Sequence, residues 1–389
     1  MKLKIGNIEE DKKNLNFETR TLKIKGDEGI IKTPIRGMNN QELKSKEKVP
    51  TEVSMMSDFS VIFRNFTSNE SYKILTDNNY VKNLIAFIES YKIRMQHSSF
   101  IFSFLQPYQK VFNDIHFNKE KFLRISLNIQ REAGLKYVGF PWLNAPSNEV
   151  IKLYDAYQRE LNDQQEPIFT IDAGTHPLEL EKIIEYVKKL NETGRVNFLG
   201  ILYKKTRSAL PSYDMLWEKL KDSNLGIILL NVDRESFNMD NLSSSHVQEF
   251  ILGDIMVTKI NRFFAGDNPP EPKPIQSNLK FFNQEDLRLL TINKFKDNSW
   301  INKVSNCFSK KDDIEHVLKN YMEAENDDLK KLILNSISKT HEFLTSSDEF
   351  KNSQKFIDSN ETSEYIKGKN ILSKNLIQIK SKKLTQFTV

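Results

Sequence analysis

Four short apolar runs recur between residues 167 and 262, separated by more polar segments. They occupy residues 168–171, 196–203, 225–232 and 254–260. The segments between the first three carry apolar residues at helical spacing, with Leu180, Ile183, Ile184 and Val187 as one buried stripe. This alternation of strand and helix patterns is typical of βα units that build a parallel sheet.

The first part of the chain supplies further extended runs. Residues 20–25 alternate apolar with polar side chains, residues 26–29 form a turn, and residues 30–35 resume an extended pattern, which together predict a β-hairpin. Residues 1–20 are polar and are predicted to be loosely held, and residues 39–52 are predicted to form a charged loop. Further strands are expected at 53–62, 99–105 and 135–142, and further helices at 72–91, 119–131, 149–161, 211–220 and 243–252.

About eight extended runs with helices between the later ones favour a (β/α)8 TIM-type barrel with an N-terminal β-hairpin and a C-terminal helical extension. An open doubly wound sheet is the alternative. The barrel is preferred because no Gly-x-Gly-x-x-Gly turn follows an early strand.

The clearest boundary is a proline-rich stretch at residues 269–274. It divides the chain into a barrel domain with its hairpin, residues 1–268, and a helical C-terminal region, residues 275–389. In the second region, helices are predicted at 284–290, 313–321 and 327–344. Residues 346–370 are polar and predicted to be mobile, and residues 374–383 form a basic tail.

Composition limits the chemistry. The net charge of +5 permits a polyanionic partner without requiring one. The single cysteine, Cys307, excludes an internal disulfide and a zinc site of three or four cysteines. The histidines are scattered, so no metal and no cofactor is predicted. With no apolar run long enough to cross a bilayer and no signal-like start, we expect a cytoplasmic protein without membrane contact.

In a barrel of this class, the chemistry lies where strands end and the following loops begin. This rule selects Asp172 and Asp233 as candidate catalytic carboxylates, because each follows an apolar run. It also selects cations that would bind phosphate groups, namely Lys204, Lys205, Arg207, Lys259 and Arg262.

Structural explanations remain open for these residues. Asp172 is also placed to cap the helix that begins near Pro177, and the other charges would suit a solvated loop. Asp58 is a weaker third carboxylate, and His176 is interpreted as a helix-start residue. Polar and aromatic side chains near strand ends that could contact a base are Gln106, Tyr108, Phe140 and Trp142.

Two segments resemble a known family. The run RTLKIKGDEGIIKTPI at residues 20–35 resembles the opening hairpin of the tRNA-guanine transglycosylase superfamily. The run FILGDIMVTKINR at residues 250–262 is similar to a late-strand segment of that family. The resemblance implies a barrel that exchanges a guanine-type base in tRNA or DNA through a covalent glycosyl-aspartate.

The departures from the family pattern are also specific. The family's Asp-Ser-Gly-Gly-Phe-Gln segment and its zinc site are absent, and the nucleophile's position falls near Val257 or Thr258, neither of which is a carboxylate. The resemblance still implies a nucleic-acid base-exchange transglycosylase-like protein (a pentosyltransferase of the guanine or 7-deazaguanine class). The alternatives are a non-catalytic nucleic-acid-binding subunit, working with a protein partner or as a homo-oligomer, and an unrelated barrel enzyme acting on a small phosphorylated substrate.

Overall fold

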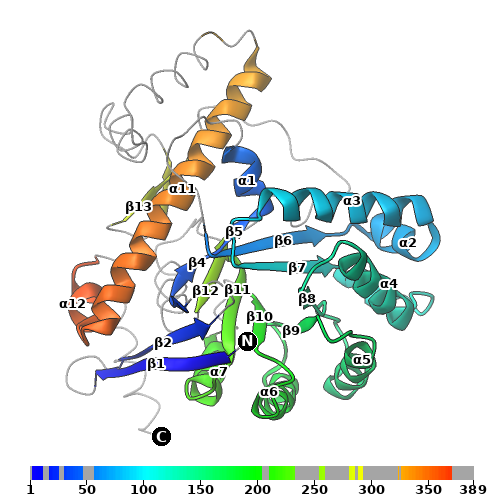
Figure 1. Ribbon diagram of the computed structural model, residues 1–389, viewed down its shortest axis with the longest axis horizontal. Helices are drawn as coiled ribbons and strands as arrows, with labels where there is room; N and C mark the ends of the chain where they lie inside the picture. Colours follow the sequence, from blue (N-terminus) through cyan, green and yellow to red (C-terminus); the bar gives the residue numbers. More distant parts are fainter. Residues whose placement is uncertain are drawn as a thin grey trace, which may run out of the picture.

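The computed structural model describes residues 2–11, 17–25, 30–46, 57–203, 210–232, 254–258, 280–284, 288–291, 323 and 326–369. A single parallel sheet dominates these residues (Figure 1). Its strands, in chain order, are β4 (Ile35–Arg36), β5 (Met38–Asn39), β6 (Phe59–Asn65), β7 (Phe100–Gln106), β8 (Tyr137–Gly139), β9 (Glu166–Asp172), β10 (Phe198–Leu202), β11 (Gly226–Val232) and β12 (Ile255–Thr258).

The sheet closes on itself. Its spatial order runs β4-β12-β11-β10-β9-β8-β7-β6-β5, and only Gly37 separates the two end strands β4 and β5. Residues 35–39 are therefore one strand, whose first half pairs with β12 and whose second half pairs with β6. Within the described residues, this makes an eight-stranded parallel barrel, so the predicted fold is confirmed and the open sheet is excluded.

Gly37 permits the closure. A Cβ atom at this position would lie 3.1 Å from Cγ2 of Val257 and 3.4 Å from Cγ2 of Ile255. The Gly37 amide donates to the Met256 carbonyl at 2.9 Å. A side chain at this position would crowd the methyl groups of β12 that face it.

Helices cover the outside of the barrel (Figure 1). They are α1 (Asn40–Lys46), α2 (Ser68–Thr76), α3 (Asn78–Arg94), α4 (Lys119–Glu132), α5 (Ser147–Arg159), α6 (Pro177–Glu192), α7 (Leu210–Leu220), α11 (Asp327–Asp358) and α12 (Thr362–Lys367), with a 3-10 turn η1 (Gln109–Asn113) after β7. The helix predicted for 72–91 is in fact two helices. Asp77 ends α2 and caps α3, because its carboxylate accepts from the amides of Asn79 and Tyr80.

Aromatic rings fill the N-terminal half of the barrel interior. Phe59 stacks on Phe100 with ring centroids 4.8 Å apart, and Phe102 meets Phe198 across the barrel at 5.0 Å. One level higher, the ring of Phe104 lies against Gly200. The barrel is therefore a packed core at this end, and a ligand can be bound only at the other end.

An antiparallel sheet of three strands, β1 (Lys2–Asp11), β2 (Phe17–Lys25) and β3 (Ile30–Lys32), precedes the barrel. The predicted hairpin is confirmed by the pairing of β2 with β3. The prediction that residues 1–20 are loosely held is wrong, because β1 pairs with β2 from Lys2–Lys25 to Asp11–Phe17. The polar side chains of β1 gave no strand pattern in the sequence, and the strand is held by backbone pairing with β2.

Arg20 joins this sheet to the barrel. Its guanidinium is buried, pairs with Asp254 at 2.5 Å and donates to the carbonyls of Leu220, Ser223 and Leu225 at 2.8, 3.0 and 2.7 Å. These carbonyls and Asp254 precede β11 and β12, at the N-terminal end of the barrel. The opposite end is consequently left for function.

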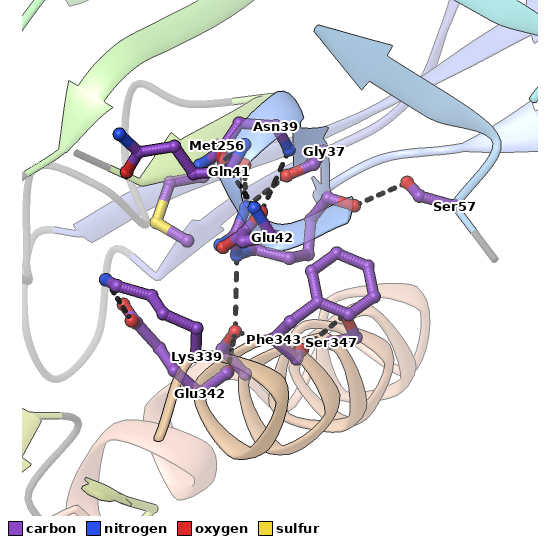
Figure 2. Close-up of polar contacts among 12 residues, drawn as sticks. Gly37, Asn39, Gln41, Glu42, Ser57, Met256, Lys339, Glu342, Phe343 and Ser347 are labelled. Atoms are coloured by element: carbon purple, nitrogen blue, oxygen red, sulfur yellow. Dashed lines mark hydrogen bonds and ion pairs between the residues drawn. The ribbon is translucent and has the colours of Figure 1, made fainter. Parts of the chain in front are cut away.

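The outer face of the closing strand is held by α11. Arg36 is fully buried, pairs with Glu42 of α1 and donates to the Ser346 hydroxyl of α11 at 3.2 Å. The Phe343 ring lies 5.3 Å from its guanidinium carbon. Figure 2 shows Glu42 lying between α11 and Asn39. The backbone amide of Asn39 donates a hydrogen bond to Glu42 Oε2 at 2.9 Å.

Several predictions outside the barrel core are corrected. Residues 40–46 form α1, where a loop was expected. Of the helix predicted at 284–290, Gln284 is in a turn and residues 288–290 belong to β14 (Arg288–Thr291), which pairs antiparallel with β13 (Lys280–Asn283), while residues 285–287 lie outside the described residues. The polar segment 346–370 is largely α11 and α12. Its buried stripe is made partly of serines, and Ser346 and Ser353 bond to carbonyls of their own helix, so no apolar periodicity marks it. The proline-rich stretch, the helices predicted at 243–252 and 313–321 and the basic tail lie outside the described residues.

We expect Arg20→Met to lower the free energy of unfolding by about 3–5 kcal/mol, because it leaves the Asp254 carboxylate buried without its charge partner. Arg20→Lys should cost less, since it keeps the charge but cannot reach all the carbonyls. Urea unfolding followed by circular dichroism measures both. A loss below about 1 kcal/mol for Arg20→Met, as for a surface ion pair, would contradict this role.

Candidate functional site

The candidate site is the mouth of the barrel, meaning the C-terminal ends of the strands. Three side chains that meet at Gly200, those of Phe104, Thr170 and Leu230, define which residues point inward, because a Cβ on Gly200 would lie within 3.4 Å of each. Side chains alternate along a strand, so Asp172 shares the inward face with Thr170 and lies closer to the mouth. The structure therefore brings the predicted carboxylate Asp172 to the place where barrel chemistry occurs.

Donors hold both oxygens of the Asp172 carboxylate. The Gly174 amide donates to Oδ1 at 2.7 Å, and the Gln109 side-chain amide donates to Oδ2 at 3.2 Å. The side chain is 5% exposed. Its backbone carbonyl also accepts from Thr175, which tightens the loop. Asp172 does not cap α6, because the N-cap residue is the exposed His176, which makes no side-chain capping bond.

Gln106 serves the framework. Its amide nitrogen donates to the Trp142 carbonyl at 2.8 Å, and its amide oxygen accepts from the Trp142 amide at 3.0 Å. This pair extends the β7–β8 ladder beyond the end of the short strand β8. Trp142 and Phe140 are buried in the core. These three residues therefore brace the mouth.

The remaining candidates fall into two groups. Asp58 precedes β6, is exposed, and lies at the N-terminal end of the barrel, so it cannot act with Asp172. The other candidate site residues lie outside the described residues and stay predictions, namely Lys204, Lys205, Arg207, Asp233, Lys259 and Arg262.

Two mouth residues were missed by sequence analysis. Gln109 lies in η1, past the proline that ends β7, where no pattern marked it. Asn231 lies within the apolar run of β11 and has a φ of 63°. Asn inside an otherwise apolar strand was the available signal for the second. No cluster of metal-ligating side chains is present in the described part of the chain.

A carboxylate also fixes two helices at the rim. The Ser147 amide, at the start of α5, donates to Glu179 Oε2 of α6 at 2.7 Å. The Ser147 hydroxyl, the same amide and the Lys182 ammonium lower the pKa of Glu179 from its ordinary value of 4.5 to about 2. Pro146, the N-cap residue of α5, offers no side-chain cap, so Glu179 replaces it from the neighbouring helix.

Comparisons with known proteins give no family. No family model matches the chain, and no curated protein matches it. A GH18 chitinase from Pseudoalteromonas aurantia aligns at 11% identity over 60% of this chain and 97% of that chain, with a TM-score of 0.35. A putative lyase/mutase from Burkholderia cenocepacia aligns at 10% identity over 58% and 76%, with a TM-score of 0.33.

The carboxyl transferase domain of Rhizobium etli pyruvate carboxylase aligns at 7% identity over 82% of this chain and 48% of that chain, with a TM-score of 0.36. Since these scores are below 0.5, the assignment of the fold rests on the closed strand order. None of the described helices has the length and apolar character needed to cross a membrane.

We expect Glu179→Gln to flatten the acid limb of the stability curve. A lowered folded-state pKa contributes stability that is fully present above pH 4.5 and is lost as the pH falls toward about 2. The variant lacks this titration, so its stability should fall less over that window. Urea unfolding at a series of pH values measures it, with Glu192→Gln on the same helix as control. Parallel curves for Glu179→Gln and the wild type would contradict the assignment.

Proposed function

We propose that the protein is a barrel enzyme that exchanges a base in a nucleic acid, with Asp172 as its acidic group. The single observation that supports this is the buried, oriented carboxylate at the mouth. A nucleophile or general base acts best when it is held in one geometry, and the donors from Gly174 and Gln109 hold both oxygens of Asp172. The proposal takes its reaction class from the resemblance of residues 20–35 and 250–262.

In this reaction, the carboxylate oxygen attacks the anomeric carbon of the nucleotide, the glycosidic bond breaks, and the outgoing base keeps the electron pair and takes a proton from water. The nitrogen of the incoming base then attacks the same carbon, gives its N–H proton to water and displaces the carboxylate. Gln109 keeps Oδ2 in position through both steps. The nucleic acid, tRNA or DNA, is the proposed partner, and the predicted cations around the mouth would contact its phosphates.

A second candidate is a barrel enzyme acting on a small phosphorylated substrate. The same carboxylate at the mouth supports it, because an oriented carboxylate also suits proton abstraction. The two candidates differ in whether a polymer is needed. They therefore separate on salt dependence, since contacts with a phosphate backbone weaken steeply as salt rises.

We expect labelled guanine to be incorporated into tRNA or duplex DNA by the wild type, and Asp172→Asn to lower the rate by at least about 10²–10⁴-fold. Gln109→Ala, which only frees the carboxylate, should lower it by about 10²-fold. Asp163→Asn, an exposed carboxylate in the loop before β9, is the matched control and should leave it unchanged.

Three results would count against the proposal. Incorporation that survives Asp172→Asn would remove the carboxylate from the reaction. Salt-sensitive binding without incorporation would favour the non-catalytic subunit. Salt-insensitive behaviour toward both polymers would favour the small phosphorylated substrate.

A further inference from the structure

The strand β11 contains a bulge next to the mouth. In its pairing with β12, Leu229 lies opposite Met256 and Val232 lies opposite Thr258. Two residues, Leu230 and Asn231, therefore share one partner position, that of Val257. A bulge of this kind redirects a side chain, and bulges are enriched beside active sites. Leu230 points inward at Gly200, and the extra residue interrupts the alternation of side chains after it, so Asn231 need not face outward.

The backbone at Asn231 is in the left-handed region, with a φ of 63°. Among the described residues, one other non-glycine residue adopts such a φ, Asn360 at 59°, in the turn between α11 and α12. Asn360 follows the end of a helix, where this conformation is common. Asn231 is inside a strand, where it is not, and such conformations gather at binding and catalytic sites.

The side chain of Asn231 also has a buried acceptor without a donor. Its Oδ1 atom is shielded from solvent and accepts no hydrogen bond from the described residues. An amide oxygen in this state destabilises the folded protein. Glycine would suit the same φ and would remove that oxygen. An asparagine at this position is explained if its Oδ1 accepts a hydrogen bond from a bound ligand.

The position of Asn231 relative to Asp172 follows from the strand register. Leu202 of β10 pairs with Asp172 on one side and with Leu230 on the other, so Asp172 and Leu230 lie at one level of the barrel. Asn231 is the next residue toward the mouth. Two strand spacings, roughly 10 Å, separate the backbones of β9 and β11. Side chains that project inward from both strands can contact one small ligand.

We infer that the side chain of Asn231 turns into the mouth and that its Oδ1 accepts a hydrogen bond from a ligand that Asp172 also contacts. A carboxylate and an amide oxygen together select a ligand edge that carries at least two N–H or O–H donors. The amino-substituted edge of a purine has this chemistry, and so does a sugar with adjacent hydroxyl groups. The inference rests on the proposed function only in taking the mouth as the site.

The test compares Asn231→Gly with the wild type in two measurements. Equilibrium dialysis against labelled guanine and against ribose 5-phosphate gives the dissociation constants. Urea unfolding gives the midpoint. We expect the dissociation constant of whichever probe binds to rise at least tenfold in Asn231→Gly, while the unfolding midpoint stays the same or moves to higher urea. Asn231→Asp, which keeps an acceptor oxygen, should retain more binding than Asn231→Gly.

The matched control is Asn360→Gly. It changes the other asparagine with a left-handed backbone, which lies in the turn between α11 and α12. It should leave both dissociation constants unchanged. A lower unfolding midpoint in Asn231→Gly would assign the residue a structural role and overturn the inference. Equal binding by Asn231→Gly and the wild type would also overturn it.

The outcome for the proposed function is separate. Binding of ribose 5-phosphate alone, with the expected dependence on Asn231, keeps the inference and removes the base-exchange proposal. If guanine binds with the same dissociation constant in Asn231→Gly and the wild type, the inference is overturned and the base-exchange proposal is kept. If the wild type binds neither probe at millimolar concentration, both are overturned.

Discussion

Closure of the barrel at residues 35–39 is the constraint on which the other features depend. This one strand must pair with β12 through its first half and with β6 through its second. The absence of a side chain at Gly37 leaves room for the methyl groups of Val257 and Ile255 on β12. If the ring opened here, the inward faces of the strands would no longer converge, and the residues at the mouth would not share a site.

Two buried arginines secure that closure from different directions. Arg20 joins the N-terminal sheet to Asp254, at the start of β12. Arg36 projects from the closing strand itself toward α1 and α11. It forms an ion pair with Glu42 and donates a hydrogen bond to the Ser346 hydroxyl. Burying a guanidinium is costly unless its donors are satisfied. Both arginines meet carboxylates, so the charges fix how distant segments join, beyond what apolar packing specifies.

Asp254 and Asn231 differ in how the buried oxygens of their side chains are satisfied. At the N-terminal end, the Asp254 carboxylate accepts from Arg20, Thr33 and the Ile227 amide. At the mouth, Asn231 combines a left-handed backbone with a buried Oδ1 that accepts no hydrogen bond within the described part of the chain. A fold can carry such a local cost when the rest of it is well determined.

The sequence alone determined the class of the fold, because strand and helix periodicities depend on which side of an element faces the core. It also marked Asp172, since a carboxylate directly after an apolar run is visible without coordinates. The sequence did not predict segments whose buried faces are polar. In α11, for example, serine hydroxyls donate hydrogen bonds to carbonyls of their own helix. Only the tertiary structure decided that residues 35–39 close the ring, that Gln109 orients Asp172, and that β11 carries a bulge at Leu230 and Asn231. Each of these depends on register and on contacts between segments far apart in the chain, and no local pattern encodes such contacts.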